Sequence, residues 1–346
     1  MNQMGRSAGP RPSLSGRLSP VPILQVATGF WASQALLTAV ELRVFTILFQ
    51  GPKSAAEVAE AAGADAAAME ALLDANCAIG FLQRQGDRYK NDEVSNAFLV
   101  ESVPGNYVEM VRFMRDPLYP LWSSLRERVR GGGPPTVPQG NDELEIGLAR
   151  AFHTGGYATM ARVAEILDLE FSVVSTLLEI GSHTGPGTLC LARRYPQLHA
   201  TIVDRPVFQA VSEEFIRSMK LEERVRFVSG DPDAAQPGAN ADLILVPHHL
   251  SRRSRNAIPL ILAAARASLR DGGHIIVTEF LLEDSHAEPR EAALYRLNVL
   301  AAYGAGNAGA LTRGELTKYL QEAGFAGIDM VGLPIFGITA ITATKG

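Results

Sequence analysis

Cysteine is nearly absent from this sequence of 346 residues, in which Cys77 and Cys190 are the only two. They stand far apart, each inside an apolar helical pattern, so neither a disulfide framework nor a cysteine-based zinc site is indicated. We expect two buried thiols in a reducing compartment. The seven histidines also lack a ligand-like spacing with carboxylates, and the sequence therefore predicts no metal centre.

Long apolar runs are missing as well. No stretch reaches the roughly 18 consecutive apolar residues that span a bilayer, and the candidate Ala257–Ala265 is followed at once by Arg266. Residues 1–20 contain Arg, Ser, Gly and Pro but no apolar segment of the kind found in secretory signals, so we expect a disordered tail. These features predict a soluble, cytoplasmic protein without a membrane partner.

An excess of positive charge is also lacking. Lys and Arg total 32 and Asp and Glu total 37, which gives a net charge of −5 without a long run of either sign. Nucleic-acid binding needs a basic face that displaces phosphate counterions, so that class of function is not favoured. Hydrophobic residues make up 47% of the chain, enough for a large core, and the length indicates two domains.

The first predicted domain spans residues 21–100. Its pattern over Ile23–Leu48 is helical and hydrophobic on most sides, so that this helix needs a partner. Ser54 then opens a capping box for a short helix, Asp65 caps a second helix, and strand-like segments flank a Gly86-Asp87 turn. Two short helices and a hairpin predict a winged helix, although the second helix lacks the side chains of a DNA-recognition helix.

A mostly helical region, residues 101–170, follows this domain and is broken by the linker Gly131–Pro135. It holds a large share of the aromatic residues of the chain. These side chains either line an apolar substrate cavity or simply pack helices together. The candidate substrate contacts are Phe113, Met114, Trp122, Phe152, His153 and Tyr157, together with Asn298 further along the chain.

From Thr176 onward, apolar strands alternate with helices. The predicted strands are Thr176–Ile180, Ala200–Val203, Val225–Val228, Leu243–Val246, Ile275–Thr278 and Phe336–Ala343, and the predicted helices are Gly187–Tyr195, Val207–Met219, Ile258–Leu269 and Arg313–Ala323. Such alternation indicates a parallel sheet covered on both faces. Residues 171–346 are therefore predicted to form a Rossmann-like, doubly wound α/β domain with a mostly parallel sheet, which binds ligands at the carboxyl ends of its strands.

Acidic residues stand at the carboxyl ends of three successive predicted strands. The first strand runs into a loop that reads Glu179-Ile-Gly181-Ser-His-Thr-Gly185-Pro-Gly187, whose glycines permit close approach of a ligand. Its spacing differs from the G-x-G-x-x-G of dinucleotide binders and disfavours a nicotinamide enzyme. The second strand ends in Asp204, which is placed to accept ribose hydroxyls, and the third is followed by Gly230-Asp231.

These motifs resemble those of the class I S-adenosylmethionine-dependent methyltransferases. More closely, nearly the whole chain after the tail is similar to the small-molecule O-methyltransferases of the caffeic-acid and acetylserotonin type. The matching features are the winged-helix-like part, Glu179-x-Gly181-x-x-Thr184-Gly185, Asp204 with Pro206 two residues on, Leu221-x-x-Arg224-Val225 before Gly230-Asp231, Leu269-x-x-Gly272-Gly273, Leu311-Thr312-x-x-Glu315-Leu316 and Ala323-Gly324-Phe325.

The resemblance implies that S-adenosylmethionine is the cofactor and S-adenosylhomocysteine the product. In that family the first motif contacts the amino-acid part of the cofactor, the second-strand acid holds the ribose, and the third-strand acid reaches the adenine. His183 stands where the family usually has glycine. The resemblance also implies a homodimer formed through the N-terminal helices. The residues that it assigns to the cofactor are Glu179, Gly181, Ser182, His183, Gly185, Asp204, Arg205, Asp231, Pro232 and Pro247.

The catalytic pattern departs from the family. The usual H-x-x-H-D-W provides a general base after the fourth strand, but the run here reads His248-His249-Leu250-Ser251-Arg252-Arg253, with Ser251 at the position of the base. A positioned base typically contributes ~10²–10⁴-fold to proton removal. Either His248 or His249 takes over as the base, with His248 preferred, or the acceptor needs no base. Arg252 and Arg253 recognise an acidic group or lie in a solvated turn.

The sequence thus predicts a methyltransferase of secondary-metabolite or antibiotic biosynthesis. Its substrate is a small aromatic or polyketide-like molecule, methylated on oxygen, or on nitrogen or carbon if no base is present. Two alternatives stay open at this stage. One is a tailoring enzyme of the same fold that hydroxylates, decarboxylates or cyclises, and the other is a binding homologue without activity. The retained Glu179, Asp204 and Asp231 argue that the cofactor site is in use.

Overall fold

The computed structural model describes residues 18–131, 141–167, 169–234, 240–304, 306–307 and 309–346. The chain divides into two compact units, Met1–Val100 and Glu101–Gly346, so the helical region predicted for residues 101–170 belongs to the second unit. The predicted tail lies outside the described residues as far as Arg17, and the predicted linker does so after Gly131.

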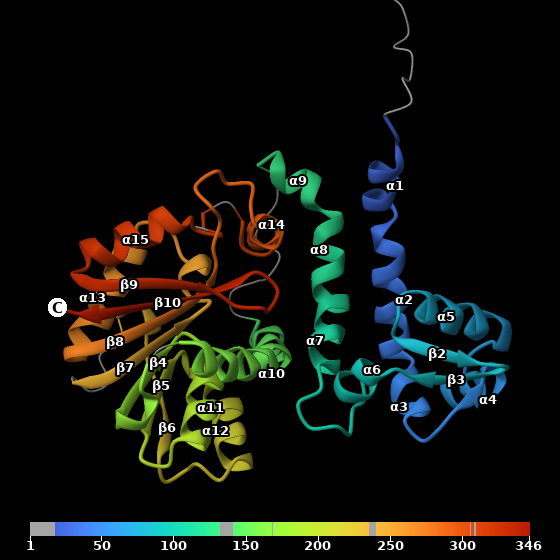
Figure 1. The fold of residues 1–346 in the computed structure, drawn as a ribbon, viewed down its shortest axis with the longest axis horizontal. Coiled ribbons are helices and arrows are strands. Elements are labelled where there is room, and N and C mark those ends of the chain that lie inside the picture. The colour runs from blue at the N-terminus through green and yellow to red at the C-terminus, as the bar shows by residue number, and fades with distance from the viewer. Residues whose placement is uncertain (1–17, 132–140, 168, 235–239, 305, 308) are drawn as a thin grey trace, which may run out of the picture. The chain divides into compact units, whose positions relative to one another are not determined.

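The first unit consists of helices around a small antiparallel sheet (Figure 1). The helical prediction for Ile23–Leu48 holds over most of the segment, but the helix is interrupted at Thr28 and broken at Arg43, whose backbone is left-handed with φ 57°. The elements are α1 (Val21–Ala27), α2 (Gly29–Glu41), α3 (Val44–Leu48), β1 (Lys53–Ser54), α4 (Ala55–Ala62), α5 (Ala66–Ala78), β2 (Leu82–Gln85), β3 (Arg88–Asn91) and α6 (Glu93–Phe98).

Local sequence signals decide much of this unit. Ser54 and Glu57 form the predicted capping box at the start of α4, and the Asp65 side chain accepts a hydrogen bond at the start of α5. The hairpin of β2 and β3 turns at Gly86, and β1, which is not predicted, adds a third strand in the order β1-β3-β2. Cys190 is buried as expected, but Cys77 is only partly buried.

The helical stretch Val21–Glu41 is long and apolar enough to cross a membrane by length and composition alone. A count of uninterrupted apolar residues misses it, because Gln25, Thr28 and Gln34 lie within it. Few of its residues are buried within the chain, and an apolar surface of this kind marks a contact with another molecule. The large exposed apolar side chains are Val21, Ile23, Leu24, Val26, Phe30 and Trp31.

The second unit is built on a seven-stranded sheet in the order β6-β5-β4-β7-β8-β10-β9. The first five strands in that order are parallel, and β10 runs antiparallel to β8 and β9. All six predicted strands are present, and β9 is an addition. The bounds are β4 (Thr176–Ile180), β5 (His199–Asp204), β6 (Val225–Ser229), β7 (Ala241–Pro247), β8 (Leu269–Phe280), β9 (Phe325–Gly332) and β10 (Ile338–Lys345).

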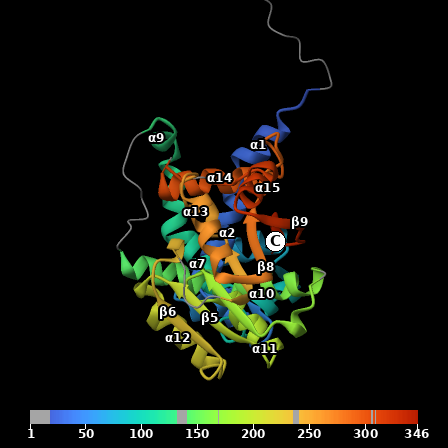
Figure 2. The same cartoon turned by 90° about the vertical axis from the view of Figure 1, so that its left-hand side faces the viewer.

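Helices cover both faces of this sheet (Figures 1 and 2), which confirms the doubly wound α/β prediction. On one face, α13 and α15 pack against β7 and β8, and on the other, α10, α11 and α12 pack against β4, β5 and β6. The helices are α7 (Val108–Phe113), α8 (Tyr119–Ser123), α9 (Leu125–Val129), α10 (Asp142–Ile166), α11 (Pro186–Arg194), α12 (Gln209–Ser218), α13 (Ile258–Ser268), α14 (Arg290–Tyr303) and α15 (Arg313–Glu322).

Strand order places the topological switch between β4 and β7. The chain leaves β4 outward through β5 and β6 and then returns to β7 on the opposite side of β4. Doubly wound sheets bind their ligands at the carboxyl ends of the two strands that flank such a switch. The residues after Ile180 and Pro247 therefore begin the candidate site.

Candidate functional site

The loop after β4 needs glycine at two positions. Gly181 and Gly185 have left-handed backbones, with φ 69° and 66°. A Cβ atom at Gly185 would lie 2.1 Å from the Cδ1 atom of Ile202, so a side chain does not fit there. Both requirements are local consequences of turning from a buried strand directly into α11.

Glu179 holds this loop in place. Its buried carboxylate accepts hydrogen bonds from the backbone N–H groups of Gly187 and Thr188, at 3.3 and 2.5 Å. Burial raises the pKa of Glu179, and the hydrogen bonds from the start of α11 oppose this rise. The sequence predicts that a ligand binds the Glu179 carboxylate. In the structure, the carboxylate oxygens instead accept hydrogen bonds from backbone N–H groups at the start of α11.

Asp204 ends β5 beside the loop and is buried. Its Oδ2 atom accepts a hydrogen bond from His183 N at 2.7 Å, and its Oδ1 atom accepts one from Arg205 N at 2.8 Å. Burial alone would raise the pKa of Asp204, but the hydrogen bonds from His183 and Arg205 outweigh it and hold the pKa well below its usual range. The group is therefore a carboxylate at neutral pH. The Arg205 guanidinium pairs with Glu145 of α10.

After β6, the acidic side chain that bonds to other residues of the candidate site is Asp233, which the sequence analysis did not identify. It accepts hydrogen bonds from His249 Nε2 at 2.7 Å and from Arg253 Nε at 2.8 Å. Burial opposes ionisation, but these two donors lower the pKa of Asp233 to about 2. The predicted Asp231 is exposed, its side chain accepts a hydrogen bond from the Asp233 backbone N–H group, and Pro232 is buried between them.

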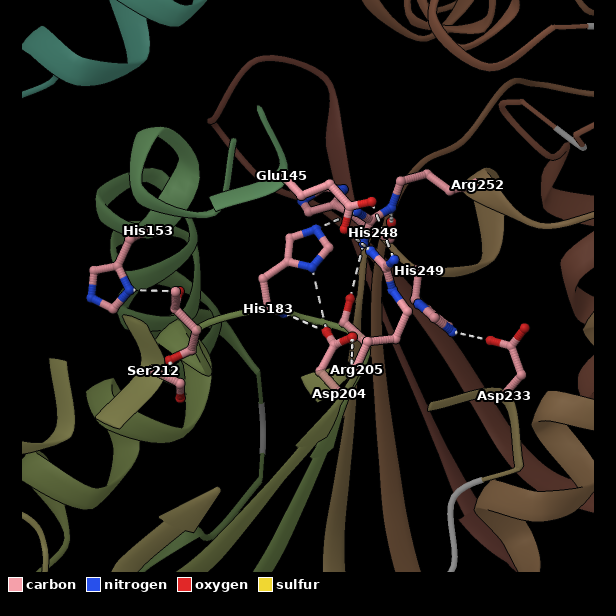
Figure 3. A network of polar contacts seen from close by, with 12 residues as sticks. Glu145, His153, His183, Asp204, Arg205, Ser212, Asp233, His248, His249 and Arg252 are labelled. Carbon is pink, nitrogen blue, oxygen red and sulfur yellow. Dashed lines mark hydrogen bonds and ion pairs between the residues drawn. The ribbon is translucent and has the colours of Figure 1, made fainter. Parts of the chain in front are cut away.

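His248 and His249 follow the end of β7 and point in different directions (Figure 3). The His248 backbone is left-handed, with φ 49°, and its ring packs 5.4 Å from the ring of Phe280. The His249 ring lies against Gly181, where a Cβ atom would sit 2.0 Å from Nδ1. Burial lowers the pKa of each histidine to about 4, so both rings are neutral at neutral pH.

Ser251, at the position of the family's base, is buried beside a carboxyl that the sequence reasoning did not single out. Its N–H group donates to Glu279 Oε1 at 3.1 Å, and its hydroxyl lies 3.3 Å from that of Tyr295. Burial raises the pKa of Glu279 to about 7. An acid that directly follows the apolar run Ile275–Thr278 is the sequence signal that could have found it.

Two polar atoms face each other here without a hydrogen bond. Glu279 Oε2 lies 4.0 Å from His248 Nδ1, and neither atom has a hydrogen-bond partner within the described part of the chain. Buried polar groups are normally paired, so unpaired ones at a strand end are candidates for contact with a reacting proton.

Arg252 does not lie in a solvated turn. Its guanidinium donates to Gly181 O at 2.9 Å and to His248 O at 2.8 Å, and its Nη1 atom lies 2.6 Å from His183 Nε2 (Figure 3). Arg253 pairs with Asp233. Contacts with the glycine loop therefore replace the solvated turn that the sequence leaves open for Arg252.

The predicted substrate contacts fall into separate groups. Phe113 packs edge to face on Phe152, with ring centroids 5.9 Å apart, and Trp122 Nε1 donates to Asn298 Oδ1 at 3.1 Å. Met114 is 40% exposed. These residues come from α7, α8, α10 and α14 and the turn after α7, and no single cluster among the described residues contains them all.

The remaining two predicted contacts are packing residues. His153 is buried, with Nδ1 2.8 Å from Thr184 Oγ1 and its ring stacked 3.6 Å from that of Phe215. Tyr157 packs into the core between α10 and α11. His153 therefore braces the glycine loop from outside, and Tyr157 stabilises the helix pair.

Comparison with known families settles the membership of this chain. The O-methyltransferase domain family matches residues 144–326, which is more than half of the chain, and the O-methyltransferase dimerisation domain family matches residues 24–101. The chain belongs to the O-methyltransferase family. The resemblance drawn from the motifs is thereby confirmed.

Individual relatives agree with this assignment. The chain is 29% identical to a tetracenomycin polyketide synthesis 8-O-methyltransferase of Streptomyces glaucescens, over 89% of this chain and 92% of the relative. It is 27% identical to an N,N-dimethyltransferase of Streptomyces rimosus, over 88% and 90%. Human N-acetylserotonin methyltransferase, solved in complex with SAM, superposes with a TM-score of 0.83 and 25% identity, over 96% of this chain and 100% of that structure.

Proposed function

We propose that this O-methyltransferase homologue transfers a methyl group from S-adenosylmethionine to a small aromatic or polyketide-like secondary metabolite. The observation that carries the proposal is the charged Asp204 beside a glycine loop at the topological switch of the sheet. A carboxylate at this place accepts both hydroxyls of a ribose. The named relatives act on a polyketide and on an amine, which supports the substrate class.

The polar groups at the strand ends fit this cofactor. Asp204 would accept the ribose hydroxyls, and the Gly181 carbonyl would accept the ammonium group. Ser182 Oγ is buried on the glycine loop without a hydrogen bond of normal geometry among the described residues. The cofactor supplies the methyl group on a cationic sulfonium. The carboxyl ends of β4, β5, β6 and β7 lie at one edge of the sheet, and the other predicted cofactor residues stand at or just after these ends, namely Gly185, Arg205, Asp231, Pro232 and Pro247.

His248 and Glu279 replace the missing base in this proposal. A neutral His248 accepts the proton of the acceptor hydroxyl at Nε2, and Glu279, whose Oε2 atom lies 4.0 Å from the buried Nδ1 atom on the other side of the ring, stabilises the resulting imidazolium. His249 is hydrogen-bonded to Asp233 and in this way positions the loop that follows β7. An oxygen acceptor is therefore favoured, and a nitrogen acceptor is the second candidate because an amine needs less help with proton removal.

The first unit serves assembly. We propose that residues 21–100 form a winged-helix dimerisation domain and that a second copy covers the exposed apolar side chains of α1 and α2 in a cytoplasmic homodimer. The match to the dimerisation domain family over residues 24–101 supports this role. Phe113, Phe152, Trp122 and Asn298 of the region 101–170 and of α14 then line the route of an aromatic substrate.

Calorimetric titration with S-adenosylmethionine and S-adenosylhomocysteine tests the cofactor assignment. The wild type is expected to bind both, and Asp204→Asn, which removes the charge but keeps the shape, is expected to lose about tenfold or more in affinity. Thermal unfolding of the variant checks that the fold is kept. Unchanged affinity would contradict the ribose assignment, and a wild type that binds neither compound would overturn the proposed function.

A further inference from the structure

We propose that His183 and Arg252 form an internal bridge over the cofactor site, and that this bridge competes with the cofactor for Gly181 and Asp204. The inference rests on the proposed function and adds to it a determinant of cofactor affinity. We call the contacts among Gly181, His183, Asp204 and Arg252 the Arg252 bridge.

The bridge spans the two strands that flank the topological switch. Arg252 lies five residues after the end of β7, and its guanidinium contacts the loop that follows β4. There it donates to Gly181 O and meets His183 Nε2, while its Nε–H group stays bonded to His248 O. Figure 3 shows the guanidinium and the His183 ring pointing toward each other across this place.

His183 continues the bridge to Asp204. A guanidinium only donates hydrogen bonds, so Nε2 of His183 has to be the acceptor and the ring proton has to sit on Nδ1. That atom lies 3.4 Å from Asp204 Oδ2, close enough for electrostatic attraction but without a hydrogen bond among the described residues, and the hydrogen bond to Asp204 comes from the His183 backbone N–H group. The imidazole is therefore neutral and lies between a cation and an anion, with the ring of Phe208 4.2 Å away.

The bridge uses the same acceptors that the cofactor needs. S-adenosylmethionine offers an ammonium group and two ribose hydroxyls as donors, but Gly181 O already accepts from Arg252, and Asp204 faces His183. The sulfonium and ammonium groups also place positive charge near the Arg252 guanidinium, and like charges repel strongly where water is scarce. Binding therefore requires that the side chains of His183 and Arg252 move away.

The backbone of His183 has a conformation that a histidine rarely adopts. Its φ of 66° lies in the left-handed region, which favours glycine. The His183 side chain is held there by its contacts with Asp204, Phe208 and Arg252. Glycine at position 183 would relieve the backbone and at the same time remove the ring from the site.

The test is calorimetric titration of the full chain with S-adenosylhomocysteine, which cannot be consumed. We compare the wild type with His183→Gly, Arg252→Gln and the double variant. Each single variant is expected to bind about tenfold or more tightly than the wild type. The double variant is expected to gain less than the sum, because both substitutions remove the same contact.

Arg255→Gln is the matched control. It also removes one positive charge, but Arg255 pairs with Glu315 at the start of α15 and does not take part in the bridge. Its affinity is expected to equal that of the wild type. If thermal unfolding shows that His183→Gly is misfolded, His183→Asn replaces it, since asparagine tolerates a left-handed backbone and is too short to reach Arg252.

The outcomes separate this inference from the proposed function. A wild type that binds, together with bridge variants that bind equally or more weakly, overturns the bridge and leaves the cofactor assignment intact. Weaker binding by Arg252→Gln alone would show that Arg252 holds the cofactor directly. Absence of binding by every variant would overturn the proposed function and the inference together.

Discussion

Serine at position 251 changes the chemistry available to its neighbours. The Ser251 N–H group donates to Glu279, and its hydroxyl lies 3.3 Å from the hydroxyl of Tyr295, so this side chain supplies no basic nitrogen. Glu279 keeps one oxygen unpaired and turned toward His248. Burial raises the pKa of this carboxyl, so its ionisation is coupled to the fold.

This coupling gives a pH dependence of stability. The pKa of Glu279 is raised from 4.5 to about 7 in the folded chain. Unfolding therefore releases a proton between these values, and the group destabilises the fold increasingly as pH rises through this window, by up to about 3 kcal/mol. In Glu279→Gln this contribution is absent. Thermal unfolding measures this at pH 5 and at pH 7.5. The melting temperature of Glu279→Gln minus that of the wild type is expected to be larger at pH 7.5 than at pH 5.

A constant difference between the two melting temperatures across this pH range would contradict the raised pKa. Glu283→Gln is the control, because Glu283 is exposed and pairs only with Arg313 among its described ion pairs. Its difference from the wild type is expected to stay flat over the same range.

At the scale of elements, local signals fix where helices begin, while contacts fix where they break. Capping boxes at Ser54 and Thr312 start α4 and α15 where the sequence predicts a helix. The break at Arg43 has no comparable signal, because neither glycine nor proline stands near it in Glu41-Leu42-Arg43-Val44-Phe45. Strand β9 is also not predicted, because its sequence lacks a continuous apolar run. Its hydrogen-bonded pairing with β10 stabilises it as a strand.

The cap at Ser54 gives a test at this scale. Ser54→Ala removes the side-chain acceptor for the Glu57 N–H group and is expected to destabilise α4 by about 1 kcal/mol. Hydrogen–deuterium exchange of the α4 amides measures this loss directly. Ser54→Asp restores an acceptor and is expected to exchange like the wild type. Equal protection in Ser54→Ala would show that the cap does not limit opening of this helix.

At the scale of the whole molecule, the apolar surface of the first unit is the feature that the single chain leaves unexplained. Val26 is 78% exposed and Trp31 is 65% exposed, both on the stretch Val21–Glu41. Burying such side chains stabilises an assembly by about 1.5–3 kcal/mol for each one. A second copy of the chain is the partner that the dimerisation family predicts.

Charges on this surface test the assembly. The double variant Val26→Glu/Trp31→Glu is expected to be monomeric by sedimentation velocity, while the wild type is dimeric, because a dimer interface would bury four unpaired carboxylates. Leu260→Glu, on α13 and 71% exposed, is the control and is expected to leave the dimer intact. A monomeric wild type, or one that floats with lipid vesicles, contradicts the homodimer.

The sequence by itself determined the parallel α/β core, the glycine loop and the acid at Asp204, because strand periodicity and backbone-restricted glycines act over a few residues. Tertiary structure decided the rest. Arg252 meets His183, and Glu279 meets His248, only because β4, β7 and β8 lie side by side. Such meetings depend on strand order and on the direction in which each side chain leaves its strand, and neither is encoded within a short segment.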